Sequence, residues 1–245
     1  MANLVIDIGN SYIKAAIFEG NELLRAEHYK TIQQLDDLTA GQNVSRAIIS
    51  SVKKEKEAWE DELKAEMPVV YFTREMAKGI KNHYRSPQTL GIDRLVAVMG
   101  AHCLYPDTDN LVIDAGTCIT YDYVDADGNY YGGSISPGLH MRFKAMHNYT
   151  SALPLVNADS GFEKPFGDDT ASAMLSGVQN GLKYELTGFI ESYRGSRPNL
   201  NILLTGGDGI FFDTLLKNSI FAPYIKNEPY LVLKGLNAAI QQHND

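Results

Sequence analysis

An apolar run that ends in Asp-x-Gly occurs twice in this chain. Residues 4–9 read LVIDIG, and residues 111–116, 107 positions later, read LVIDAG. Each copy continues into a second β-like run and then turns at a glycine, at residues 19–21 or 127–129, as a hairpin does. Two copies of a strand–turn–strand unit predict two similar domains rather than one.

Strands and helices alternate between and after the two copies, which indicates α/β architecture. Apolar spacing predicts strands over 47–52, 69–72 and 201–204, and helices over 53–67, 92–103, 170–193, 210–218 and 230–242. Pro106 and neighbouring polar residues interrupt the pattern near 105–110. We therefore expect an N-terminal domain at 1–105 and a C-terminal domain at 106–245.

The composition excludes several classes of protein. The formal net charge is −8, which disfavours nucleic-acid binding because a phosphate backbone needs a basic face. The apolar runs are too short to span a membrane, and the N-terminus lacks a basic leader, so we expect neither a membrane partner nor export. Two cysteines are too few for a disulfide framework. These features favour a cytoplasmic globular protein.

The Asp-x-Gly turns have a chemistry that suits phosphate. Glycine lets the backbone approach an anion closely, turn amides point at it, and the aspartate can hold a cation or its water shell beside it. Thr205-Gly206-Gly207 provides a third such loop, so the two hairpins and this loop suggest a nucleotide clamp. The chain has neither a P-loop nor a Rossmann glycine motif. The alternative is that each Asp-x-Gly is a simple hairpin turn.

Four motifs, in their order, resemble those of the type III pantothenate kinases, and the resemblance covers essentially the whole chain. They are Asp7-Ile8-Gly9-Asn10-Ser11 with Lys14, Gly91-Ile92-Asp93-Arg94, Asp114-Ala115-Gly116-Thr117 and Thr205-Gly206-Gly207-Asp208. The family usually has threonine where this chain has Ser11. The resemblance implies an actin-like ATPase (ribonuclease H-like) fold of duplicated α/β domains with an interdomain nucleotide cleft. It also implies ATP-dependent phosphorylation of pantothenate, the first step towards coenzyme A.

The same resemblance implies a role for each site residue. Asp93 matches the catalytic base, and Asp114 matches the ligand of a monovalent cation, K+ or NH4+. Pantothenate would be bound by residues of the second motif and by two outside it: Tyr84, Gly91, Ile92, Asp93, Arg94 and Thr170. ATP, with Mg2+, would be bound by the first loop and one residue of the third motif: Asp7, Ile8, Gly9, Asn10, Ser11, Tyr12, Ile13, Lys14 and Thr117. The family also forms homodimers, so we expect one.

Each of these residues has a plainer interpretation. Asp93 lies in the first turn of a helix, where an acid is a favourable dipole partner. Arg94 fits a surface ion pair, Tyr84 a packing role and Lys14 a solvent-facing strand position. Thr170 stands where an N-cap or first-turn residue is expected. His102, His140 and His147 lack ligand-like spacing and are expected to pack or to face solvent.

Two other functions remain open from the sequence. Another kinase with the actin-like ATPase fold, one that phosphorylates sugars or acetate, would share the phosphate loops but lack Gly91-Ile92-Asp93-Arg94. A non-catalytic accessory factor in transcription would belong to the same family as a regulatory binding protein. The acidic charge disfavours direct contact with DNA, and the intact Asp93 favours retained chemistry.

Overall fold

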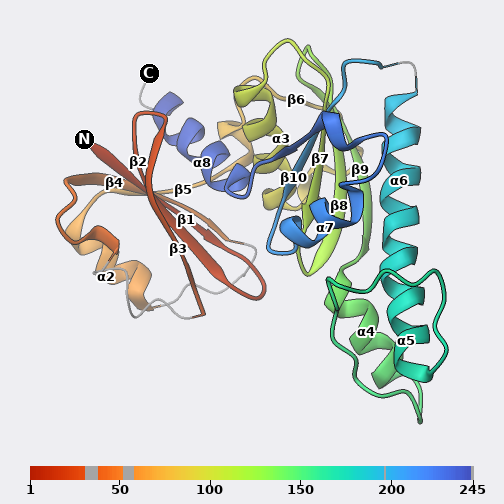
Figure 1. Cartoon of the computed structure of the whole chain (residues 1–245). Coiled ribbons are helices and arrows are strands. Elements are labelled where there is room, and N and C mark those ends of the chain that lie inside the picture. The colour runs from red at the N-terminus through yellow and green to blue at the C-terminus, as the bar shows by residue number, and fades with distance from the viewer. Residues whose placement is uncertain (31–37, 52–57, 196, 244–245) are drawn as a thin grey trace. The chain divides into compact units, whose positions relative to one another are not determined.

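The structure, a computed structural model, describes residues 1–30, 38–51, 58–195 and 197–243 (Figure 1). The chain forms two compact units, and each is described by itself. Unit 1 comprises residues 1–107, 127–131 and 230–245, and unit 2 comprises 108–126 and 132–229. The expected boundary after residue 105 lies close to the division at 107. The C-terminal segment, expected in the second domain, packs with unit 1 instead because its helix covers the sheet of that unit.

The sheet of unit 1 has the strand order β3-β2-β1-β4-β5. Its members are β1 (Ala2–Ile8), β2 (Ile13–Glu19), β3 (Glu22–Tyr29), β4 (Val44–Ser51) and β5 (Val69–Tyr71). The first three strands form an antiparallel meander, whereas β4 and β5 run parallel to β1. The two-residue strand β6 (Lys81–Asn82) pairs with the start of β9 (Asn129–Pro137).

Both faces of β1 are buried, which explains its continuous apolar sequence. On one face, Leu4, Ile6 and Ile8 pack in a core with Leu63 of helix α2 (Ala58–Glu66). On the other face, α8 (Leu231–Gln242) contacts β1, β2 and β4. There the buried amide of Asn3 donates to the side-chain oxygen of Asn237 at 3.0 Å.

Helix α8 also crosses α3 (Ile92–Leu104) at a close approach built on two glycines. A Cβ on Gly100 would lie 2.7 Å from the carbonyl oxygen of Leu231. A Cβ on Gly235 would overlap the carbonyl oxygen of Val96 and lie 2.9 Å from a Val96 methyl carbon. The two backbones therefore touch, and no side chain fits between them. This contact fixes α3 on α8, and α8 lies on the sheet.

Unit 2 repeats the strand order of unit 1. Its sheet runs β9-β8-β7-β10-β11, with β7 (Asn110–Ala115), β8 (Cys118–Val124), β10 (Asn201–Thr205) and β11 (Ile225–Asn227). β8 is antiparallel to β7, and β10 and β11 are parallel to it, as β2, β4 and β5 are to β1. Helices α6 (Gly181–Arg194) and α7 (Gly209–Leu216) pack on one face of this sheet in a shared core. The predicted duplication of α/β units is therefore confirmed.

Helices α4 (Leu139–Asn148) and α5 (Thr170–Leu175) lie at the N-terminal end of α6 (Figure 1). The helix predicted over 170–193 is α5 and α6 joined by a π-helical segment, Ser176–Asn180. In this segment, the Gln179 amide bonds both the N–H and the carbonyl oxygen of Asp159, each at 2.8 Å. The Asn180 amide donates to the carbonyl oxygen of Lys164 at 3.0 Å. The wide turn thus ties the preceding loop to the helix.

Replacement of Gly235 by alanine tests the glycine crossing. Gly235→Ala should lower the free energy of unfolding by about 1–3 kcal/mol, because the new methyl group overlaps the α3 backbone. Urea-induced unfolding followed by circular dichroism measures it. The matched control is Gly188→Ala in α6, where a Cβ meets nothing within 4 Å. That control should gain up to about 1 kcal/mol from helix propensity. An unchanged or raised stability in Gly235→Ala would contradict the close crossing.

Candidate functional site

The first predicted phosphate loop is a tight turn between β1 and β2. The Gly9 amide donates to the carbonyl oxygen of Tyr12 at 3.0 Å, which closes the turn. Asn10, Ser11 and Tyr12 are exposed. The flanking Ile8 and Ile13 are paired across the hairpin and buried in the core, so a nucleotide can meet only their backbone atoms. The loop therefore offers small polar side chains and amides.

Charged side chains lie next to this turn, on one face of the sheet. Asp7 and Lys14 are partners across the β1–β2 ladder, and Asp7 is buried. Because side chains alternate along a strand, both lie on the face opposite to the Ile8 core. The sequence left open whether Lys14 faces solvent. The register places its side chain beside a buried carboxylate.

The second loop, between β7 and β8, meets the β10–α7 loop in unit 2. Gly206 has φ of 89°, and a Cβ there would overlap a carboxylate oxygen of Asp114. Glycine is therefore required both by its backbone conformation and by its contact with Asp114. The Asp208 amide donates to the carbonyl oxygen of Ala115 at 2.9 Å, which ties the two loops together.

The start of α4 lies against the same pair of loops. The Gly138 amide donates to the carbonyl oxygen of Thr117 at 3.1 Å. From the first turn of α4, His140 Nε2 reaches 3.5 Å from Asp208 Oδ1. Burial raises the pKa of the Asp208 carboxyl, and the nearby His140 opposes that shift. His140 is exposed, one of the two outcomes expected for it, but its place beside Asp208 had no signal in the sequence.

Asp93 lies in the first turn of α3, as predicted, with Gly91 as the N-cap residue. One oxygen of its carboxylate accepts the backbone N–H of Arg94 at 2.9 Å. A Cβ on Gly91 would overlap that same oxygen. The Gly-x-Asp-Arg spacing therefore has a local cause: glycine leaves room for the carboxylate at the amide end of the helix, where negative charge is favourable.

Arg94 and Tyr84 lie together in unit 1. The Arg94 side chain is 6% exposed, so it is no surface ion-pair residue, and its guanidinium lies 5.8 Å from the centroid of the Tyr84 ring. Tyr84 in turn stacks on the buried Tyr130, with ring centroids 6.5 Å apart. A packing role and a binding role are compatible for Tyr84, since one face of its ring meets Tyr130 and the guanidinium lies within reach.

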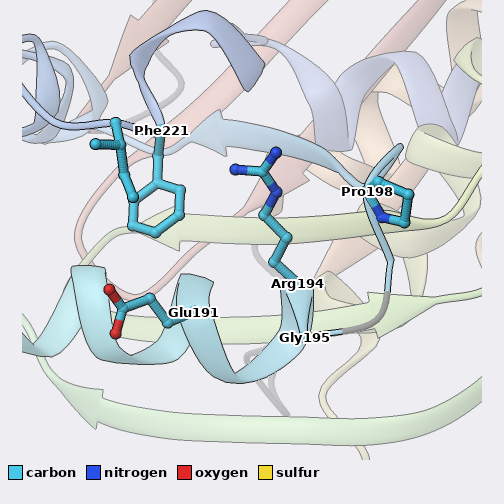
Figure 2. Close-up of a pocket in the computed structure, with 6 residues that line it drawn as sticks. Glu191, Arg194, Gly195, Pro198 and Phe221 are labelled. Atoms are coloured by element: carbon cyan, nitrogen blue, oxygen red, sulfur yellow. The ribbon is translucent and has the colours of Figure 1, made fainter.

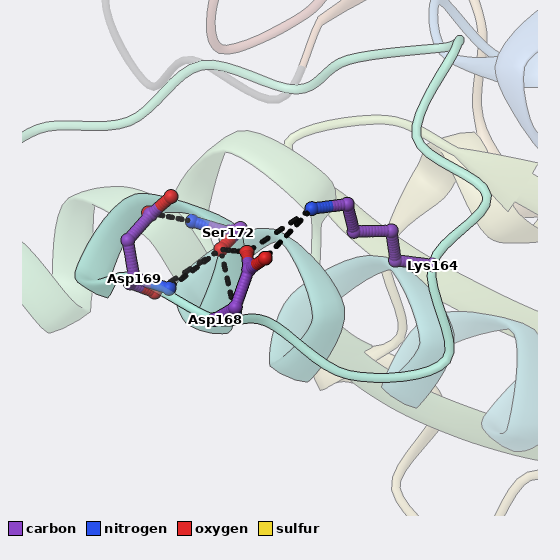
Figure 3. Close-up of polar contacts among 4 residues, drawn as sticks. All are labelled: Lys164, Asp168, Asp169 and Ser172. Carbon is purple, nitrogen blue, oxygen red and sulfur yellow. Dashed lines mark hydrogen bonds and ion pairs between the residues drawn. The ribbon is translucent and has the colours of Figure 1, made fainter.

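Thr170 is the first residue of α5, and the N-cap residue before it, Asp169, is drawn in Figure 3. Asp169 accepts the Ser172 amide at 2.8 Å, and its own amide donates to the Ser172 hydroxyl at 3.0 Å, which completes a capping box. Lys164 pairs with Asp168 at 3.0 Å. These contacts occupy the polar neighbours of Thr170 and leave Thr170 itself exposed on the first turn.

Among the described residues, no group of three or more His, Cys, Asp or Glu side chains could hold a metal ion. Mg2+ that accompanies a nucleotide is bound mainly through phosphates and water, with one or two carboxylates. Asp7, a buried carboxylate near the carboxyl end of β1, fits that pattern.

A surface hollow of ≈ 440 Å³ lies elsewhere in unit 2 (Figure 2). It is lined by Glu191, Arg194, Gly195, Pro198, Ile220 and Phe221. The Arg194 guanidinium covers the Tyr224 ring at 3.8 Å from its centroid. The chain passes from this hollow into the start of β10, whereas Gly206 and Asp208 follow the end of β10. The hollow therefore lies at the opposite end of β10 from the β10–α7 loop.

Comparison with known proteins assigns the family. The model of the type III pantothenate kinases matches residues 3–192. The chain belongs to the type III pantothenate kinase family. It is 44% identical to the type III pantothenate kinase of Bacteroides fragilis strain YCH46, over 99% of this chain and 98% of that protein. It is 43% identical to that of Phocaeicola vulgatus, over 99% of each chain.

Solved structures agree on the fold of this family member. A protein from Campylobacter jejuni, proposed to be a Baf family transcriptional activator, has a TM-score of 0.62 and 21% identity, over 98% of each chain. The activator of 2-hydroxyisocaproyl-CoA dehydratase from Clostridium difficile, with bound ADPNP, has a TM-score of 0.58 and 12% identity, over 100% of this chain and 97% of that one. At such identities the likeness extends to the fold alone. Within the part of the chain that the structure describes, no helix is long and apolar enough to cross a membrane.

Replacement of Gly91 by alanine tests the placement of Asp93. The added methyl group should push the carboxylate away from the Arg94 amide, and a displacement of about 1 Å costs up to roughly a hundredfold in rate. We therefore expect kcat to fall about tenfold or more, with the KM for ATP little changed. ADP release with ATP and pantothenate, the substrates that the resemblance implies, measures it. Gly188→Ala is the control for the same chemical change, and equal kcat values in the two variants would contradict the prediction.

Proposed function

We propose that this chain transfers the γ-phosphoryl group of ATP to the primary hydroxyl of pantothenate, giving 4'-phosphopantothenate, with Asp93 as the general base. Membership of the type III pantothenate kinase family supports the reaction, which is the first step of coenzyme A biosynthesis. The observation that supports Asp93 is its carboxylate at the amide end of α3, held by the Arg94 N–H.

The role of Asp93 follows from the nature of phosphoryl transfer. The transition state is loose, so the attacking alcohol loses its proton late and needs a group that orients it more than a strong base. One oxygen of Asp93 is engaged with the helix amide. The other can accept the hydroxyl hydrogen of pantothenate and take the proton as the hydroxyl becomes more acidic.

Arg94 supplies the charge that an acidic substrate requires. Its guanidinium is nearly buried, carries a fixed positive charge and presents donors that can grip a carboxylate with two bonds. Tyr84 beside it limits how the guanidinium can turn. Thr170, exposed on the first turn of α5, offers a hydroxyl to the polar part of pantothenate, as the family resemblance implies. Gly91 and Ile92 complete this proposed side of the pocket.

ATP is proposed to bind at the two Asp-x-Gly turns. The amides and small polar groups of the first loop, with Lys14, would face the phosphates, and Thr117 would contact them from the second loop. Mg2+ bound with ATP would neutralise charge on the phosphate oxygens. The buried carboxylate of Asp7 is placed to accept hydrogen bonds from the water shell of that ion.

Asp114 is proposed as a ligand of a monovalent cation. Ions such as K+ take oxygen ligands, and the Asp114 carboxylate lies against the β10–α7 loop, close to the carbonyl oxygen of Ala115. The loop contact made by Gly206 brings these oxygens together. A cation there would balance the negative charge of Asp114 beside the nucleotide phosphates.

A homodimer is also proposed, as the resemblance implies. Large apolar side chains are exposed on and near α4, α5 and α6 in unit 2: Met141, Tyr149, Leu155, Phe166 and Tyr184. Apolar groups gathered on one part of a surface are typical of a protein interface. A second copy of the chain is the partner that this family would place there.

Replacement of Asp93 by asparagine tests the proposed base. Asparagine keeps the size and one acceptor oxygen but cannot take a proton, so kcat should fall roughly a hundred- to ten-thousandfold. ATP binding, measured by calorimetry, should change little. The assay couples ADP release to NADH oxidation with ATP alone, with pantothenate and with glucose. Release that depends on pantothenate identifies the acceptor. A folded Asp93→Asn enzyme within about threefold of the parent would remove Asp93 from this role.

The proposed cation site predicts a dependence on the monovalent salt. At matched ionic strength, the rate in K+ or NH4+ should exceed that in Na+ by about fivefold or more, the lower end of typical coupling between two bound ligands. Asp114→Asn should abolish the difference, because the ligand charge is gone. Circular dichroism of the variant controls for folding. Equal rates of the parent enzyme in all three salts would contradict the site.

A further inference from the structure

A row of polar side chains crosses the sheet of unit 1 at the end of β1. Asp7 on β1 is the ladder partner of Lys14 on β2 and also of Ser50 on β4. Lys14 in turn is the partner of His28 on β3. Since ladder partners point to the same face, these four side chains lie in line on the face opposite to the Ile8 core.

Ser50 is the member of this row that the sequence did not single out. It is 1% exposed, and its hydroxyl has no hydrogen-bond partner among the residues that the structure describes. Its neighbour on the strand, Ile49, points into the core on the other face. A buried hydroxyl that lacks a partner is destabilising and needs an explanation.

The position of Ser50 supplies an explanation. Adjacent strands lie about 4.8 Å apart, so the hydroxyl of Ser50 and the carboxylate of Asp7 are side by side. The cationic Lys14 lies on the other side of Asp7. A hydroxyl beside a carboxylate provides oxygen atoms that can accept hydrogen bonds from the water molecules bound to Mg2+. The neighbouring ammonium group can pair with the phosphates that the ion accompanies.

We propose that Ser50 is a further residue of the nucleotide site, and that its hydroxyl joins the Asp7 carboxylate in hydrogen-bonding the water shell of the divalent cation bound with ATP. This inference rests on the proposed function. It extends the site from the β1–β2 turn to β4, a strand outside the motifs that carry the family resemblance. Ser50 is a positioning residue, since it acts on the cation through water.

A merely structural Ser50 would behave differently. If Ser50 only fills space, Ser50→Ala should leave nucleotide binding unchanged. If it belongs to the site, removal of the hydroxyl should weaken binding while the unliganded protein stays as stable as before or becomes more stable. The gain in stability is expected because a buried polar group without a partner is lost. Binding and stability therefore move in opposite directions only under the proposal.

The experiment measures ATP binding by calorimetry without pantothenate, once with Mg2+ and once with EDTA. For Ser50→Ala we expect the Kd of Mg-ATP to rise about three- to tenfold, the value of one hydrogen bond, and the Kd in EDTA to stay unchanged. Urea unfolding of the unliganded variant should give an equal or higher stability. Ser45→Ala is the matched control. Ser45 lies on the same strand at its other end, and its hydroxyl donates to the Ala2 carbonyl oxygen.

Three results would overturn the proposal. An unchanged Kd of Mg-ATP would place Ser50 outside the site. An equal loss with Mg2+ and with EDTA would mean that the hydroxyl contacts the phosphates and not the cation's water. An equal loss in Ser45→Ala would mean a general effect on β4. A parent enzyme that binds Mg-ATP but shows no ADP release dependent on pantothenate would contradict the proposed function alone, so the two failures are distinguishable.

Discussion

The contact between the backbones of α3 and α8 is the constraint on which unit 1 depends. Gly100 and Gly235 allow it, because neither helix could come as close with a side chain at these positions. Helix α8 lies on β1, β2 and β4, so its contact with α3 holds α3 beside the sheet, where α3 also touches β4. The orientation of the Asp93 turn therefore depends on two glycines, one near the end of α3 and the other in the C-terminal helix.

Much of the fold was predictable because its causes are local. Asp-x-Gly turns, glycine hairpins and alternating apolar runs identify β1–β2–β3 and β7–β8–β9 as copies. The placement of α8 was not predictable in the same way. The apolar face of α8 predicts that this helix packs against another element, but it does not identify which sheet that element belongs to. The glycine contact with α3, the Asn3–Asn237 bond and the contacts of α8 with β1, β2 and β4 make it part of unit 1.

The π-helical segment shows a second limit of sequence patterns. The buried apolar residues of α5, the π-helical segment and α6 recur every four positions, at Met174, Val178, Leu182, Leu186 and Ile190. A regular helix of 3.6 residues per turn would carry such a series gradually around its axis. The wide turn at Ser176–Asn180 offsets part of this drift and frees Gln179 to bind the loop at Asp159. The spacing of apolar residues predicted a helix, but it did not predict whether the turn at this point is regular or wide, because that depends on their relative energies.

Some residues of the candidate site could likewise be predicted from the sequence, and others could not. The motif residues were identified because glycine next to a carboxylate is a local pattern, and Gly91 beside Asp93 has a local steric cause. Ser50 and His140 gave no signal, since a serine in an apolar strand and a lone histidine are both common. Their significance comes from ladder register and from the contact between the α4 start and Asp208. The cleft between the two domains stays a prediction.

Unit 1 is discontinuous, and this affects how the protein is made. The five-stranded sheet leaves the ribosome early, but the helix that covers its second face is encoded after all of unit 2. At translation rates of about 5–20 residues per second, the delay is on the order of 10 s. During that time the apolar sheet face that contains Val5, which α8 covers in the folded protein, is exposed to solvent. The burial of this sheet face therefore depends on completion of synthesis, which supplies the covering helix.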